Sequence, residues 1–243
     1  MRDARAGALL VLCSLVCGLS GCGTPSPEAV AQNDPWESTN RDIFAFDVWV
    51  QHHVAKPVVE GYRVVLPRPA RDGVHNVATN LRSPVILADD VLQARPKRAA
   101  QTLARLVLNS TIGLGGLFDV AGRMGIPWHD NDFGITLGMA GAQEGSYLVL
   151  PLLGPRPPRD LVCGLVDGLF DPFTWSRFPG RHELLTARTG VNIVDTADRN
   201  LDQFLGIERT SIDFYASSRS LYRQSRKAQI EGGQPLFQNL PNL

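Results

Sequence analysis

The sequence predicts a mainly α-helical domain with little or no sheet, and three observations lead to this prediction. The composition, 44% hydrophobic and 20% charged over 243 residues, is typical of a chain that packs a core. A residue that can cap a helix, followed by proline and then by apolar residues at helical spacing, occurs at Asp34-Pro35 and again at Ser83-Pro84. Extended patterning is scarce, because only 147–153 forms a continuous apolar run and Pro151 interrupts it. With 23 glycines and 17 prolines, the helices are expected to break often.

The predicted domain opens with a helix at Asp34. Asp34 can cap this helix, Pro35 suits its first position, and Glu37 completes a capping-box arrangement. The apolar residues of the helix form a broad face and are Ile43, Phe44, Phe46, Trp49 and Val50. A second helix is predicted over 69–81, and Ser83-Pro84 predicts a separate third helix that runs to Leu92.

Arg95-Pro96 opens the longest periodic stretch, which runs into a cluster of glycines. Gly113, Gly115 and Gly116 each cost about 0.8 to 1 kcal/mol of helix propensity relative to alanine. This segment is therefore expected to be kinked, or to pack against something that needs a bare backbone. Further helices are predicted over 161–170, 182–204 and 208–230, before an irregular tail over 232–243.

The N-terminus has the pattern of an export signal. Two arginines precede an apolar run over 6–19, which is too short for the roughly 20 residues that cross a bilayer. Small residues close the run at Cys22 and resemble the lipobox of bacterial lipoproteins, in which this cysteine becomes acylated. Residues 1–21 are thus expected to be a cleaved signal peptide, 22–33 a flexible tether and 34–231 the domain. By the same resemblance to bacterial lipoproteins, Gly23 rather than aspartate after the cysteine implies sorting to the outer membrane.

Charge and cysteine content exclude several classes of protein. The 24 basic and 24 acidic residues balance, so no global field favours a nucleic-acid partner. Cys13 and Cys17 leave with the signal and Cys22 carries lipid, so the mature chain keeps Cys163 and no internal disulfide is expected. Because its neighbours are apolar, Cys163 is interpreted as a small buried residue rather than a nucleophile.

A search for catalytic and metal-binding patterns gives no candidate. Nucleophile-elbow and phosphate-loop motifs are absent from the sequence. The adjacent His52-His53 would diverge on a helix and are interpreted as wet surface, and the run 129–132 lacks the register of a calcium loop and is interpreted as a polar loop. Asp89-Asp90 is interpreted as one acid near a cap and one exposed acid. We therefore expect no catalytic residue, no metal and no cofactor.

Several blocks of the sequence, spread over about 34–231, form one recognisable pattern. The most specific block is 108–121, with its Asn-Ser-Thr-Ile-Gly-Leu-Gly-Gly-Leu-Phe-Asp core. The other blocks are Asp34-Pro35, Asn40-Arg41, Lys56-Pro57, Tyr62, Arg71, Gly73, Asn76, Asn80-Leu81, Pro84, Leu92-Gln93, 132–138, 147–155, Arg159-Asp160, 211–215, Arg219 and Tyr222. Together these blocks resemble the VacJ/MlaA family of outer-membrane lipoproteins. Departures from the family's pattern at Asp47, Ala94, 141–146 and 156–158 affect loop detail.

The resemblance implies a ring-like assembly of amphipathic helices around a channel, lipid-anchored on the periplasmic side of the outer membrane. Through this channel a misplaced phospholipid would leave the outer leaflet, with no bond broken. The family passes the lipid to a soluble periplasmic carrier, MlaC, and associates with trimeric porins. Phospholipid is then the transported ligand, and the lipid on Cys22 is the covalent group.

Two sets of residues are candidates for these roles. The first set would line the lipid channel and comprises Ile112, Gly113, Leu114, Gly115, Gly116, Leu117, Phe133 and Gly134. The second set would form one basic face that docks the carrier and comprises Arg219, Arg223, Arg226 and Lys227. An ordinary solvated face remains the alternative for the second set, and packing in the core remains the alternative for the first.

Two other functions stay open on the sequence. A lipid-modifying enzyme would use Ser110, Ser146 or Asp132, although no base is positioned beside them. A passive scaffold that holds porins or other envelope parts would need no lipid path. Release of lysophospholipid and fatty acid would indicate the enzyme, and unchanged outer-leaflet phospholipid after loss of the protein would indicate the scaffold.

Overall fold

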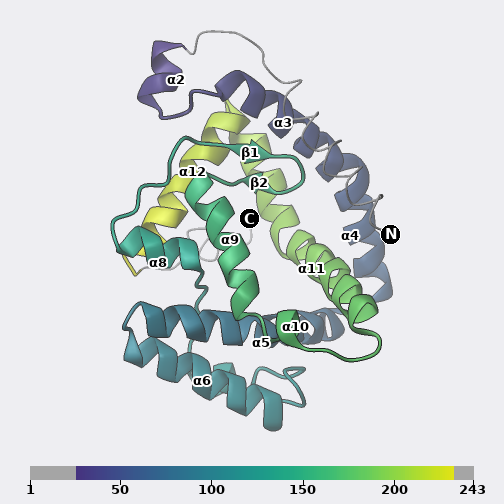
Figure 1. Ribbon diagram of the computed structural model, residues 1–243. Coiled ribbons are helices and arrows are strands. Elements are labelled where there is room, and N and C mark those ends of the chain that lie inside the picture. Colours follow the sequence, from purple (N-terminus) through teal and green to yellow (C-terminus); the bar gives the residue numbers. More distant parts are fainter. Residues whose placement is uncertain (1–25, 233–243) are drawn as a thin grey trace.

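A computed structural model describes residues 26–232 and confirms the mainly helical prediction (Figure 1). The helices and strands, in chain order, are α2 (Pro27–Ala31), α3 (Glu37–Val50), the π-helix η1 (Gln51–Ala55), α4 (Lys56–Val65), α5 (Arg68–Leu92), α6 (Pro96–Thr111), α7 (Val120–Arg123), α8 (Phe133–Met139), β1 (Val149–Leu150), β2 (Gly154–Pro155), α9 (Pro158–Phe170), α10 (Pro172–Trp175), α11 (Arg181–Thr210) and α12 (Phe214–Ile230). The strands pair as one short antiparallel hairpin, of which β1 lies within the run 147–153 predicted to be extended and β2 lies just after it.

The helices close a ring, as predicted. Helix α5 contacts α9, α9 contacts α8, α8 contacts α12, α12 contacts α11, and α11 returns to α5. In Figure 1, α5 crosses the lower side with α6 beneath it, and α11 rises beside α4 on the right. Each helix of the circuit therefore has a neighbour on either side, and α6 packs outside the circuit against α5.

Helix α5 corrects the prediction of two helices that meet at Ser83-Pro84. It runs unbroken through Pro84, and the Ser83 hydroxyl bonds back to the Thr79 carbonyl instead of capping a new helix. An interior proline removes one backbone hydrogen bond and costs about 3 kcal/mol or more. Burial of Val85 and Ile86, which are 6% and 1% exposed, offsets this cost.

The segment before the domain corrects a second prediction. The tether expected over 22–33 contains helix α2, which Ser26 caps through its side chain. Ala29 is buried, and the Asn33 carbonyl accepts a hydrogen bond from the Tyr147 amide at 2.9 Å. The residues from 26 to 33 therefore dock on the domain. The predicted signal peptide, the lipidation site Cys22 and the tail beyond 232 lie outside the described residues.

A small aromatic core joins α3, the hairpin and α12. Tyr147, Val149 and Tyr215 are its buried members, and Phe44 packs edge-on against Tyr215 at 5.6 Å between ring centroids. Asn40 crosses this core as a polar bridge, because its side chain bonds both the Tyr147 carbonyl and the Val149 amide. The core therefore fixes the hairpin against α3 and α12.

Candidate functional site

The interface between α5 and α6 is lined by polar side chains. Those on α5 are the buried Asn80 and Ser83, and those on α6 are the buried Thr102, Arg105 and Asn109. The Asn80 amide donates to Ser110 Oγ at 2.9 Å, which ties the two helices together. Two helices that pack together in water normally bury apolar side chains between them and expose polar ones. This interface is inverted, with polar side chains between the helices.

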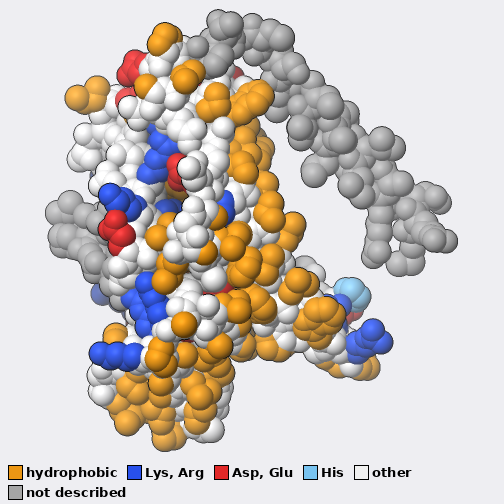
Figure 2. All heavy atoms as spheres, turned by 60° about the vertical axis from the view of Figure 1, so that its left-hand side comes forward, with side chains coloured by type: hydrophobic (Ala, Val, Ile, Leu, Met, Phe, Trp, Pro, Cys, Tyr) orange, Lys and Arg blue, Asp and Glu red, His pale blue; other side chains and the backbone are white. Residues whose placement is uncertain are grey.

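The outer face of α6 is apolar. Leu103 and Val107 are 49% and 51% exposed, and Ile112 and Leu114 beyond the helix end are 65% and 68% exposed. Figure 2 shows hydrophobic side chains gathered over the lower end of the molecule, where Figure 1 places α6. Contiguous exposed apolar surface marks contact with lipid or another apolar partner. The hairpin of α5 and α6 thus has the arrangement expected of helices that face an apolar medium.

The turn after α6 holds most of the predicted channel residues. A Cβ on Gly113 would lie 2.4 Å from the Phe118 carbonyl oxygen, and one on Gly116 would lie 2.7 Å from Asn80 Cβ. Both glycines therefore serve close packing, which was the alternative left open by the sequence. Gly115 has a positive φ of +72° with open space around it. Together with the exposed Ile112, Leu114 and Leu117, it forms the part of the turn that faces outward.

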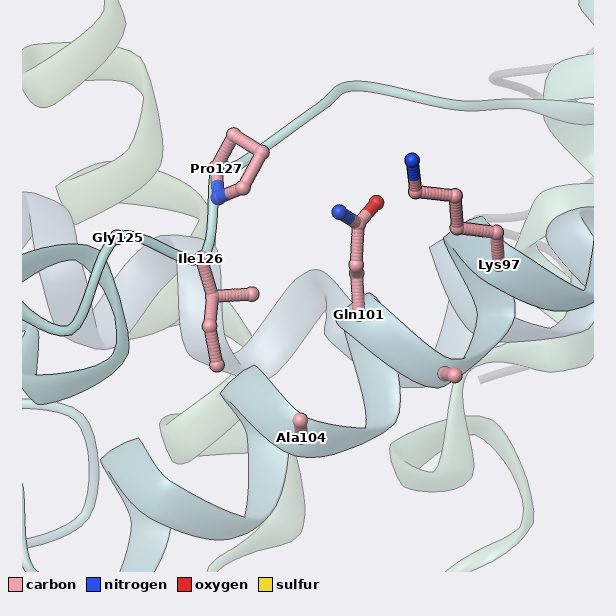
Figure 3. Close-up of a pocket in the computed structure, with 7 residues that line it drawn as sticks. Lys97, Gln101, Ala104, Gly125, Ile126 and Pro127 are labelled. Carbon is pink, nitrogen blue, oxygen red and sulfur yellow. The ribbon is translucent and has the colours of Figure 1, made fainter.

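The segment that follows this turn is held on α6 by Arg105. Its Nη1 donates to the Ile126 carbonyl at 2.6 Å, and its Nη2 donates to Asp119 at 2.8 Å. A hollow of about 330 Å³ lies between α6 and this segment (Figure 3). It is lined by Lys97, Ala100, Gln101, Ala104, Gly125, Ile126 and Pro127.

Phe133 and Gly134, the remaining channel candidates, lie at the start of α8 beside buried charges. Phe133 packs edge-on against Phe170, and its amide donates to Asp167 at 2.9 Å. A Cβ on Gly134 would approach Arg226 Nη2 to 2.6 Å and Asp160 Oδ1 to 2.7 Å. Gly134 is thus required for an ion-pair cluster to reach α8.

That cluster is centred on Arg226 of α12. Its guanidinium binds both oxygens of Asp132 at 2.7 and 3.0 Å and reaches Asp160 Oδ1 at 2.9 Å. Burial by itself raises the pKa of the Asp160 carboxyl, but Arg226 beside it holds that pKa below its ordinary value. The cluster joins α8, α9 and α12, which are three members of the ring.

Two of the four residues predicted for the docking face of α12 point inward instead. Arg226, with 12% of its side chain exposed, binds Asp132 and Asp160 as described, and Arg219, 8% exposed, lies against the buried carboxylate of Asp34. The spacing does place these arginines along one face of α12. That face packs inward because Asp34, Asp132 and Asp160 form ion pairs with it. Arg223 lies 3.0 Å from Glu144, and Lys227, with 76% of its side chain exposed, lies near Glu231.

Comparison with known proteins decides the family. The family model described as "MlaA lipoprotein" matches residues 32–229. The chain belongs to the MlaA lipoprotein family. It is 30% identical to the "Intermembrane phospholipid transport system lipoprotein MlaA" of Escherichia coli K12, over 92% of this chain and 89% of that protein. The protein of that name from Haemophilus influenzae is also 30% identical, over 88% of this chain and 87% of its own length.

The fold comparison agrees with the sequence comparison. The structure described under "Structural basis for maintenance of bacterial outer membrane lipid asymmetry" matches with a TM-score of 0.72 at 29% identity. The match covers 81% of this chain and 98% of that chain. None of the helices between residues 26 and 232 of this MlaA-family chain has the length and hydrophobicity needed to span a bilayer.

A second buried polar cluster in this MlaA-family protein corrects the prediction for Asp89-Asp90. Both are fully buried. Asp90 accepts from Thr102 and Asn131, and His129 Nε2 lies 2.9 Å from each of its oxygens. These hydrogen bonds hold the pKa of the Asp90 carboxyl below its ordinary value against the opposing effect of burial. The run 129–132, expected to be a polar loop, is therefore partly buried, because His129 and Asn131 bind Asp90 inside the protein.

The other sequence candidates have ordinary partners. His52 lies 3.0 Å from Glu208, and the exposed His53 bonds the Trp49 carbonyl, so the two histidines diverge as expected. Within residues 26–232, no cluster of three or more His, Cys, Asp or Glu side chains could hold a metal ion. Cys163 is buried, as predicted, and burial raises the pKa of its thiol.

Sequence reasoning missed the ion-pair clusters, although one signal could have found them. Asp160 and Asp167 share the helical face of α9 that carries Cys163 and Phe170. Acidic residues that share a helical face with buried apolar residues are expected to be buried too, and buried carboxylates need cationic partners from elsewhere in the chain. Arg226 of α12 is such a partner for Asp160.

Proposed function

We propose that this chain is an outer-membrane lipoprotein that removes misplaced phospholipid from the outer leaflet and passes it to a periplasmic carrier. This activity would maintain the lipid asymmetry of the outer membrane. The observation that carries the proposal is the near-complete match to proteins named as phospholipid transport lipoproteins, in sequence and in fold.

The inverted hairpin of α5 and α6 supports this proposal. A phospholipid that leaves one leaflet needs polar surface for its headgroup and apolar surface for its tails, because an unsatisfied polar group in hydrocarbon costs several kcal/mol. Buried polar side chains such as Asn80 and Arg105 lie on one side of α6, and exposed apolar ones such as Val107 lie on the other. The two kinds of surface are therefore one helix diameter apart.

Membrane attachment and partners complete the proposal. Acylation of Cys22 would anchor the protein on the periplasmic side, since no described helix can span the membrane by itself. A soluble carrier of the MlaC type would receive the lipid, and a trimeric porin would hold the ring in place. No bond in the phospholipid is broken, so the protein is proposed not to be an enzyme.

The test is the amount of phospholipid at the cell surface. Cells that lack the gene are expected to expose phospholipid to a phospholipase added from outside, and a plasmid copy should reverse this exposure. An unchanged surface would contradict the proposal and favour the scaffold. Purified protein that releases lysophospholipid from vesicles, in a manner dependent on Ser110 or Asp132, would contradict it in favour of the enzyme.

A further inference from the structure

A polar cavity of about 160 Å³ lies between α5 and α6, with room for several water-sized groups. Its lining comes from both helices, from the residue before α7 and from the segment after α7, and comprises His75, Asn76, Thr79, Asn80, Ser83, Arg105, Asn109, Asp119 and Trp128.

Two lining atoms are buried without a hydrogen-bond partner. They are the acceptor Asn80 Oδ1, on a residue that is 6% exposed, and the donor Trp128 Nε1. The Asn80 amide nitrogen is already used, because it donates to Ser110 Oγ and to the Gly115 carbonyl. A buried polar atom left unpaired costs about 1 to 3 kcal/mol. A hydroxyl group, which both donates and accepts, would satisfy either atom.

The charges around the cavity are balanced. Arg105 pairs with Asp119 at 2.8 Å, and His75 Nδ1 lies 2.8 Å from Asp195. Each titratable lining residue is therefore already paired with an acidic or basic side chain of the protein. A phosphate or an ammonium group would meet no unpaired opposite charge here, so the cavity favours an uncharged ligand group.

The turn after α6, which carries exposed leucines, lies next to the cavity lining. The Asn76 amide donates to the Leu117 carbonyl at 3.4 Å, which places the turn after α6 against the lining. Leu114 and Leu117 on that turn are 68% and 43% exposed. A polar cavity whose charged side chains are paired, next to exposed leucines, suits an amphiphile better than a free polyol.

We propose that this cavity binds the hydroxyl-bearing, uncharged end of a phospholipid headgroup, as in phosphatidylglycerol. This inference rests on the proposed function and adds a headgroup preference to it. Asn80 Oδ1 would accept from one headgroup hydroxyl and Trp128 Nε1 would donate to another. The phosphate and the tails would remain outside, toward the leucines of the turn.

The experiment counts lipids that stay bound to the full-length protein. The protein is incubated with equal amounts of phosphatidylglycerol and phosphatidylethanolamine in detergent and examined by native mass spectrometry. We expect it to retain phosphatidylglycerol preferentially. Trp128→Phe keeps the ring and removes the donor, and should lower phosphatidylglycerol retention about fivefold, the equivalent of one hydrogen bond of about 1 kcal/mol. Phosphatidylethanolamine retention should not change.

Trp175→Phe is the matched control, because its indole donates to the Leu169 carbonyl outside the cavity. It should leave the preference unchanged. A second measurement leaves the cavity unmodified. Replacing Trp36, Trp49 and Trp175 with Phe leaves Trp128 as the source of the indole Nε1–H NMR signal. This signal should shift when phosphatidylglycerol is added and should not shift when phosphatidylethanolamine is added. This measurement keeps the proposal testable if Trp128→Phe fails to fold.

Three results would overturn the inference. Equal retention of the two lipids, or an unmoved Trp128 signal, would mean that the cavity holds water only. Displacement of phosphatidylglycerol by a hundredfold excess of glycerol would mean that a free polyol is the occupant. In each case the proposed function would stand as long as phospholipid is bound, whereas failure to retain any phospholipid would count against the proposed function itself.

Discussion

Arg226 on α12 forms a two-pronged ion pair with Asp132, the N-cap residue of α8, through hydrogen bonds of 2.7 and 3.0 Å. The two residues are 94 positions apart in the sequence, and their side chains are 12% and 19% exposed. Asp132 also caps α8 by accepting from the Ile135 amide. One guanidinium thus fixes both the start of α8 and, through Asp160, the face of α9.

Replacing Arg226 by methionine should lower the free energy of unfolding by about 3 kcal/mol, because the largely buried Asp132 would lose its cation and Asp160 would keep only Arg159. Its neighbour Lys227 is the control, since it is exposed and its nearest acid is 3.8 Å away. Lys227→Ala should change the free energy by less than about 0.5 kcal/mol. Urea unfolding in detergent measures both, and equal effects would show that the Arg226 cluster is not stabilising.

This cluster also shows how far the sequence leads. Helical spacing correctly places Arg219, Arg223 and Arg226 along one face of α12. Whether that face meets water or acids depends on Asp34, Asp132 and Asp160, which lie far away in the sequence. Local sequence patterns predict where helices form and which residues share a helical face. Which residues that face contacts depends on the tertiary fold.

Pro84 and the glycine turn show the same limit. The proline signal that predicts a helix start is local, and burial of Val85 and Ile86 overrides it. The glycine cluster was predicted to be kinked or to pack against something that needs a bare backbone, and the structure assigns Gly113 and Gly116 to close packing. The mainly helical class was predictable because it depends on composition and periodicity, which are local.

The two neighbouring glycines should respond differently to substitution. Gly116→Ala should destabilise the protein by roughly 2 kcal/mol or more, because its Cβ would overlap Asn80 in addition to adopting a positive φ. Gly115→Ala meets open space and should cost only about 1 to 2 kcal/mol for the left-handed backbone. Gly164→Ala on α9, with no neighbour within 4 Å, is the control and should be neutral or stabilising. Thermal unfolding ranks the three, and a Gly116 variant as stable as the Gly115 variant would contradict the packing role.

Asp89 should make stability depend on pH. Burial, with further effects of Asp167 and Asp132 and despite the Thr136 hydrogen bond, raises the pKa of the Asp89 carboxyl to about 7. The folded state then keeps a proton that the unfolded state loses near pH 4, so stability should fall as pH rises from about 4 to about 7 and level off above it.

Asp89→Asn imitates the protonated acid and keeps an oxygen to accept from Thr136. It should therefore raise stability at pH 8, by on the order of 2 kcal/mol, and have little effect at pH 4. Urea unfolding at the two pH values provides the measurement. A variant that is less stable than the parent at pH 8 would show that Asp89 is ionised in the folded state.

Cys22→Ala should release the protein from the membrane or leave it as an unprocessed precursor. The reason is that the acyl chains on a lipidated cysteine contribute about 0.8 kcal/mol per buried methylene, so several chains together hold a protein durably at a bilayer. Membrane fractionation and the size of the mature protein provide the measurements. Normal processing together with unchanged outer-membrane fractionation would contradict the lipobox interpretation.

The apolar outer face of α6 should supply a weaker, second attachment. Leu103 and Val107 lie four positions apart on that face, and each is about half exposed. Purified protein with the Cys22→Ala substitution should therefore still bind phospholipid vesicles, and adding Leu103→Glu and Val107→Glu should reduce this binding at least tenfold, since each buried leucine or valine contributes about 1.5 kcal/mol or more. Leu103→Ile with Val107→Leu is the control, because it keeps the face apolar. Vesicle flotation measures the bound fraction, and equal flotation of the glutamate and control variants would mean that α6 does not meet the bilayer.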